Sequence, residues 1–198
     1  TTNMSKFEIS EKLESAGARL SFFNGQARVG FSGKFLSEDT NMVVGLLADQ
    51  LQNPLFAEEE LEKAKKRQIA GYKRSKESTR GNAMNSMLQA FYGSNHQNSP
   101  TNPDQAIEQI KTLTPESLRA YHSENYGTGS MVLVVVGDVD HAEMESLIKE
   151  SFRGWKQSPL QNKEEKGLGT KASGKVYVTM QDKTSTDFVV GTALGIDR

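Results

Sequence analysis

Apolar residues recur at helical spacing through most of the first two thirds of the chain. The pattern predicts a first helix after Ser5, where Ser5 and Glu8 form a capping box and Gly17 follows the last apolar position. Residues 37–128 have the pattern of almost continuous helix, interrupted where Asn-Pro, Gly and Thr-Pro sequences end one helix or begin the next. A second capping box, at residues 140–143, predicts the last helix.

Shorter segments carry the patterns of β-strands. Residues 19–23 and 27–34 alternate enough to be strands. Asn24 and Gly25 between them predict a two-residue hairpin turn, because both positions of such a turn favour positive φ. Residues 131–136 are apolar throughout and mostly β-branched, which is typical of a strand covered on both faces.

The composition changes after the last predicted helix. Residues 156–174 are polar, contain several glycines and show no regular pattern, as is usual for a linker. Residues 175–180 and 186–194 then resemble two strands joined by a short turn, so we expect a second module to begin there. The predicted class is α+β: a repeat over 1–155, with a mixed or antiparallel sheet packed against several helices, then the linker and a hairpin over 175–198.

Composition and charge exclude several classes of protein. Of the 198 residues, 35% are apolar and 25% are charged, which is the composition of a globular protein. The 24 Lys and Arg residues against 25 Asp and Glu residues give a net charge of −1, so no overall charge attracts nucleic acid or an anionic membrane. The longest apolar run is too short to span a bilayer, and cysteine chemistry is excluded because the chain has no cysteine. Since the chain starts at Thr1 without a signal peptide, we expect an excised or processed piece.

The side chains that could carry catalysis form no known motif. The zinc-binding patterns H-E-x-x-H and H-x-x-E-H do not occur, and neither does the serine-nucleophile pattern G-x-S-x-G. His122 and His141 have acidic neighbours but no second histidine at helical spacing, so helix-surface or cap roles explain them more simply than zinc binding.

A basic run over residues 63–76 could contact nucleic acid. The helix that contains it begins with four glutamates, which complement the helix dipole and place Glu59 with Lys63 and Glu62 with Lys66 at i,i+4. A solvated helix face is therefore the favoured interpretation, and a nucleic-acid-binding domain is the weaker alternative.

Several short segments are informative when they are considered together, in their order along the chain. They are residues 8–18, 46–56, 59–63, 92–93, 110–115, 126–127 and 131–140. Together they resemble peptidase family M16, which includes insulinase, pitrilysin and the mitochondrial processing peptidase. The likeness covers residues 1 to about 155, and Asp182 with Lys183 resembles the opening of the next repeat. The resemblance implies an α+β repeat that pairs with other M16 repeats around an unfolded peptide.

Active members of this family hold zinc through an H-x-x-E-H helix and a glutamate on the long helix after the Asn-Pro-Leu-Phe turn. The first motif precedes the segment that this chain matches. The resemblance places Gly71 at the glutamate position and Ala64 at the position of an accessory glutamate one helical repeat earlier. It therefore implies an inactive repeat with no cofactor of its own, and zinc on a partner repeat of a parent metalloendopeptidase, a hydrolase.

In the family, the substrate peptide adds as an extra strand to the sheet edge that corresponds to residues 19–23 of this chain. The candidate peptide-binding residues are thus Arg19, Leu20, Ser21, Phe22 and Phe23. Active members often carry asparagine at the position of Ser21. Phe22 and Phe23 point to opposite faces, so one alternative is that one packs in the core and the other is exposed; core packing of both is the favoured expectation.

The expected function is that of a non-catalytic repeat which helps to enclose the peptide while a partner repeat cuts it. The alternative is a structural or interaction subunit with the same fold and no role in proteolysis. The expected partners are other M16 repeats and unfolded peptide, without nucleic acid or a membrane span, and the family suggests the bacterial periplasm or cell envelope. The family's repeat has two strands before the position of Thr1, and we expect residues 175–180 and 186–194 to replace them, within the chain or in a strand-exchanged dimer.

Overall fold

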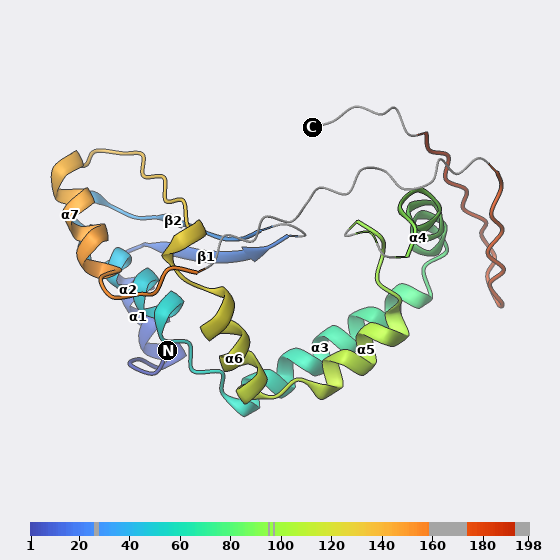
Figure 1. Cartoon of the computed structure of the whole chain (residues 1–198), viewed down its shortest axis with the longest axis horizontal. Helices are drawn as coiled ribbons and strands as arrows, with labels where there is room; N and C mark the ends of the chain where they lie inside the picture. Colours follow the sequence, from blue (N-terminus) through green and yellow to red (C-terminus); the bar gives the residue numbers. More distant parts are fainter. Residues whose placement is uncertain (26–27, 95, 97, 159–173, 193–198) are drawn as a thin grey trace. The chain divides into compact units, whose positions relative to one another are not determined.

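The computed structural model of the chain describes residues 1–192 apart from 26–27, 95, 97 and 159–173 (Figure 1). In the described residues the elements are, in chain order, α1 (Lys6–Ser15), β1 (Arg19–Asn24), β2 (Val29–Lys34), the 3-10 turn η1 (Ser37–Asp39), α2 (Thr40–Gln52), α3 (Glu58–Lys76), α4 (Thr79–Tyr92), α5 (Pro103–Thr112), α6 (Pro115–Asn125), the 3-10 turn η2 (Thr128–Ser130) and α7 (His141–Ser151). The predicted α+β class is confirmed, because a small antiparallel sheet accompanies many helices.

The chain divides into two compact units. The first contains the described residues of Thr1–Ala57 and Glu116–Gln161, with the hairpin of β1 and β2 and the helices α1, α2, α6 and α7. The second contains those of Glu58–Pro115 and Asn162–Arg198, with α3, α4 and α5. Across the described ranges, none of these helices has both the length and the apolar character that a bilayer crossing requires.

Local caps place the helices where the sequence predicts them. The Ser5 hydroxyl accepts a hydrogen bond from the Glu8 N–H at 3.2 Å, and the Glu8 carboxylate accepts one from the Ser5 N–H at 2.7 Å, so the capping box of α1 is confirmed. Hydrogen bonding of the Glu8 carboxylate to the Ser5 side chain, and then to the Ser5 backbone N–H, holds the pKa of Glu8 below its ordinary value. Gly17 follows the helix with a φ of 59°, a left-handed conformation that favours glycine.

The core of the first unit forms where α2 meets α7. Leu47, Ala48 and Phe152 are buried together. Leu20 and Phe31 of the hairpin pack against this cluster, and so do the partly buried side chains of Leu51, Met131, Ile148 and Trp155. The core therefore fixes one face of the β1–β2 hairpin.

The hairpin differs from the prediction in its turn. Asn24 pairs with Val29 as the last residue pair of the two strands. Beyond this pair, the Gly25 N–H donates to the Arg28 carbonyl at 2.8 Å. The prediction that Asn24 and Gly25 form the turn is wrong, because Asn24 is the last residue of β1 and both residues face partners across the hairpin.

Residues 131–136 form no strand in the structure, so the prediction of a strand covered on both faces is wrong. Val132, Val134 and Val136 are 82%, 77% and 93% exposed, whereas Met131 and Leu133 are partly buried. The segment thus alternates as a strand would, but a strand also needs a neighbour to accept its backbone hydrogen bonds. In the described ranges the sheet contains β1 and β2 alone, and no neighbour is present.

The tail segments at 175–180 and 186–192 are not assigned as strands either, and residues 193–194 lie outside the described residues. The tail contacts α4 and the end of α3. Thr79 donates to the Asp187 carboxylate at 2.6 Å, and Lys183 pairs with Glu77 at 2.8 Å. Since the two-stranded sheet excludes the described tail, the idea that these segments complete it within the chain is wrong. Exchange between two chains, and the start of a further repeat, remain predictions.

Candidate functional site

The candidate peptide-binding residues, Arg19 to Phe23, all lie in β1. Leu20 is partly buried, and the other four are exposed. β1 pairs with β2 along one edge, and in the described part of the chain no strand lies along its other edge. The backbone N–H and C=O groups of such an edge can bind an added strand, whatever the sequence of that strand.

The two phenylalanines of β1 lie on opposite faces of the hairpin. Phe22 shares its face with Phe31, whereas the Phe23 ring covers Gly30, where its Cε2 atom is 2.7 Å from the position that a Cβ on Gly30 would take. Phe22 is 48% exposed and Phe23 is 49% exposed. The expectation that both pack in the core is wrong, because the hairpin offers the core one face only and Phe23 instead lies against a glycine of the neighbouring strand.

Ala64 and Gly71, the two positions that the family resemblance assigns to lost carboxylates, lie on α3. Ala64 and Gly71 are seven residues apart, which is about two helical turns, so they lie on the same side of the helix. Both are partly buried. Neither residue has an oxygen, nitrogen or sulfur atom in its side chain, and a Cβ added to Gly71 would meet nothing within 4 Å.

The histidines have structural contacts. The Nε2 atom of His122 lies 2.8 Å from the carbonyl oxygen of Leu51, in the last turn of α2. Its ring stacks on Tyr126 with 4.9 Å between centroids, and Phe56 meets it edge-on at 5.8 Å. Burial, with a smaller contribution from Tyr121, raises the pKa of Tyr126. This aromatic cluster ties α6 to the end of α2.

The described side chains form no cluster that fits a zinc ion. Among the residues that the structure describes, no three His, Cys, Asp or Glu side chains gather closely enough to hold a metal. His96, for example, has local contacts instead: its Nδ1 accepts a hydrogen bond from the Asn98 N–H at 3.0 Å, and its ring stacks on Tyr92. The two positions on α3 add no ligand atom.

The acidic and basic residues of α3 form pairs at its surface. Lys63 lies 2.7 Å from Glu59, as the i,i+4 spacing predicts, and both side chains are exposed. The predicted pair of Glu62 with Lys66 is wrong, because Glu62 pairs with Lys65 at 2.7 Å instead. These pairs support the interpretation of a solvated helix face.

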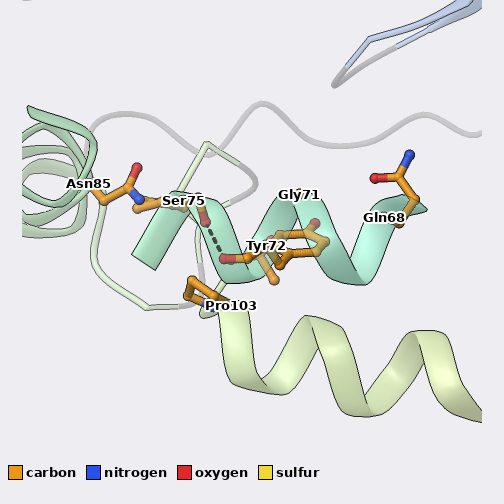
Figure 2. Close-up of a pocket in the computed structure, with 8 residues that line it drawn as sticks. Gln68, Gly71, Tyr72, Ser75, Asn85 and Pro103 are labelled. Carbon is orange, nitrogen blue, oxygen red and sulfur yellow. Dashed lines mark hydrogen bonds between the residues drawn. The ribbon is translucent and has the colours of Figure 1, made fainter. Parts of the chain in front are cut away.

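A cavity of about 360 Å³ opens beside Gly71 in the second unit (Figure 2). Eight residues of α3, α4, the loop before α5 and the first residue of α5 line it: Gln68, Gly71, Tyr72, Ser75, Asn85, Pro100, Thr101 and Pro103. The sequence singles out Gly71 for another reason and gives no sign of the cavity, because its walls are far apart along the chain.

Two family models match the chain along almost its whole length. The model described as Insulinase (Peptidase family M16) matches residues 1–104. The model described as Peptidase M16 inactive domain matches residues 112–193.

Similar curated proteins include proteases and a subunit of the cytochrome b-c1 complex. An uncharacterized zinc protease of Rickettsia felis is 26% identical over 82% of this chain and 39% of its own length. Cytochrome b-c1 complex subunit 1 of Bos taurus is 27% identical over 78% of this chain and 32% of its own. The mitochondrial-processing peptidase subunit beta of Dictyostelium discoideum is 27% identical over 77% of this chain and 31% of its own. The chain thus spans between about a third and two fifths of the length of these relatives.

A solved structure shares the fold. The crystal structure of a peptidase M16 inactive domain from Pseudomonas fluorescens matches 82% of this chain and 39% of that chain with a TM-score of 0.72, at 20% sequence identity.

Proposed function

The chain belongs to peptidase family M16, and on this basis we propose that it is a non-catalytic repeat of a zinc protease. It would form part of the wall of a peptide-enclosing chamber, while a partner repeat of the same parent protein holds the zinc ion and cuts the peptide. Its partners would be the other repeats and the unfolded peptide.

The observation that carries this proposal is the chemistry of α3. Where the family resemblance requires two carboxylates, the helix has the methyl group of Ala64 and the hydrogen of Gly71. A zinc site needs three or four ligand atoms of fixed geometry, so the loss of both carboxylates cannot be compensated by a small shift of the helix. The match to a model described as an inactive domain supports the same conclusion.

The exposed edge of β1 supports a role in holding peptide. A peptide that adds to this edge gains main-chain hydrogen bonds, which are independent of its sequence. Phe22 and Phe23, each about half exposed, would offer apolar surface on either face of the added strand. A repeat that cannot hydrolyse a peptide can still bind it in this way.

We expect an unfolded peptide to protect the β1 amides from hydrogen exchange, and those of β2 much less. The control ligand is the same peptide with its backbone nitrogens methylated at alternate residues, which keeps the side chains but removes the donors. Loss of two or more hydrogen bonds should weaken binding by about tenfold or more. Equal binding of the methylated peptide, or protection elsewhere than β1, would count against the proposal.

A structural role without proteolysis is the second candidate. It is favoured by the similarity to cytochrome b-c1 complex subunit 1, whose name describes a component of a complex and not a protease. The same exchange experiment separates the two, since a purely structural subunit should leave β1 unprotected at every peptide concentration.

A further inference from the structure

We propose that the cavity beside Gly71 is a subsite for an uncharged, hydrogen-bonding side chain of an extended peptide, such as glutamine or asparagine. The proposal rests on the proposed function in one respect, that the ligand of this chain is a peptide. It adds a preference among peptides, which the backbone contacts of β1 cannot supply.

The size and the charge of the cavity limit its ligand. Its volume of about 360 Å³ lies near the lower end of the range for small-ligand pockets, about 300–1,000 Å³. None of its eight lining residues is charged. An acidic or basic side chain of a peptide would therefore find no opposite charge to pair with among these residues, whereas an uncharged polar side chain needs none.

The polar groups of the lining have free hydrogen-bonding capacity. In the described residues, the side-chain amides of Gln68 and Asn85 and the hydroxyls of Tyr72 and Thr101 make no hydrogen bond. The Ser75 hydroxyl, in contrast, donates to the Tyr72 carbonyl at 2.7 Å (Figure 2). Free amides and hydroxyls can both donate and accept, which matches a carboxamide, since it has two donors and one acceptor oxygen.

Apolar surfaces complete the cavity. Pro100 and Pro103 supply rigid walls near the start of α5, and the partly buried Tyr72 ring adds a flat face. These surfaces suit the methylene groups of a glutamine side chain, while its carboxamide reaches the polar groups.

Gly71 makes the subsite testable without unfolding the protein. It lies in the middle of α3, and a Cβ there would meet nothing within 4 Å. Gly71→Leu should therefore place an apolar side chain at the cavity without a clash at its Cβ, and leucine has a higher helix propensity than glycine. Gly45 is a matched control, because it is also helical and equally open but lies on α2 in the other unit.

The test is an NMR titration of the ¹⁵N-labelled chain with capped pentapeptides that differ only at a central Gln, Glu, Lys or Leu. The Gln peptide should shift the amides of residues 68–75, 85 and 101 and should bind at least threefold more tightly than the other three. Gly71→Leu should weaken its binding tenfold or more, and Gly45→Leu should leave it unchanged. The inference is overturned if Gly71→Leu binds the Gln peptide normally, or if the Glu or Lys peptide binds equally well. Shifts confined to β1 would overturn the subsite alone, whereas an absence of shifts at both places would overturn the subsite and also count against the proposed peptide-binding function.

Discussion

Gly129→Ala should lower the free energy of unfolding of the first unit by about 3 kcal/mol, near the upper end of the cost of overpacking. A Cβ on Gly129 would overlap the carbonyl oxygen of Ser158 and would lie 3.2 Å from its carbonyl carbon. These are backbone atoms, so no side-chain rotation can relieve the contact. Urea denaturation followed by circular dichroism measures the effect.

The close approach at Gly129 is part of a longer backbone contact between residues 127–129 and 156–158. The Thr128 N–H donates to the Lys156 carbonyl at 3.0 Å, and a Cβ on Gly127 would overlap that same oxygen. Neither glycine has a left-handed φ, so the expected cost comes from close approach alone and not from backbone conformation. Gly45→Ala is the control and should be neutral or slightly stabilising. Unfolding of Gly129→Ala at the same urea concentration as the control would contradict the close packing of residues 127–129 on residues 156–158.

Phe152→Ala should destabilise the same unit by about 3–5 kcal/mol, the usual cost of removing a buried aromatic side chain. Phe152 is 6% exposed, lies in the cluster with Leu47 and Ala48, and stacks on Trp155 with 5.9 Å between ring centroids. Because domains are stable by only about 5–15 kcal/mol, this one change should remove a large part of the total.

The matched control is Phe7→Ala on α1, where the ring is 75% exposed. Its effect should stay within about 0.5 kcal/mol, as for most surface substitutions. Thermal unfolding of the two variants under the same conditions measures the difference in stability between them. A smaller loss for Phe152→Ala than for Phe7→Ala would mean that the core does not lie between α2 and α7.

The sequence predicts well what depends on near neighbours. The capping box at Ser5 and Glu8 and the proline at the start of α5 are interactions over three residues or fewer, and the helices begin where these signals stand. The strand pattern at 131–136 is equally clear, yet a strand exists only when another segment pairs with it. Pairing depends on distant parts of the chain, and for this reason the prediction was wrong there.

The same distinction applies to the candidate sites. That neither Ala64 nor Gly71 can bind a metal follows from the sequence alone, because neither side chain has an oxygen, nitrogen or sulfur atom. The cavity, in contrast, exists because Asn85 and Pro100 come close to one side of α3. Likewise, the exposure of Phe23 depends on Gly30 lying opposite it across the hairpin, and only the register of the strands reveals this.

The most direct test of the central claim is a zinc titration of the purified chain by isothermal calorimetry at neutral pH, after treatment with a chelator. The account predicts the heat of dilution alone, with no site of Kd below about 1 μM, because α3 offers no carboxylate at either position. One tight site per chain, held by this chain's own side chains, would contradict it.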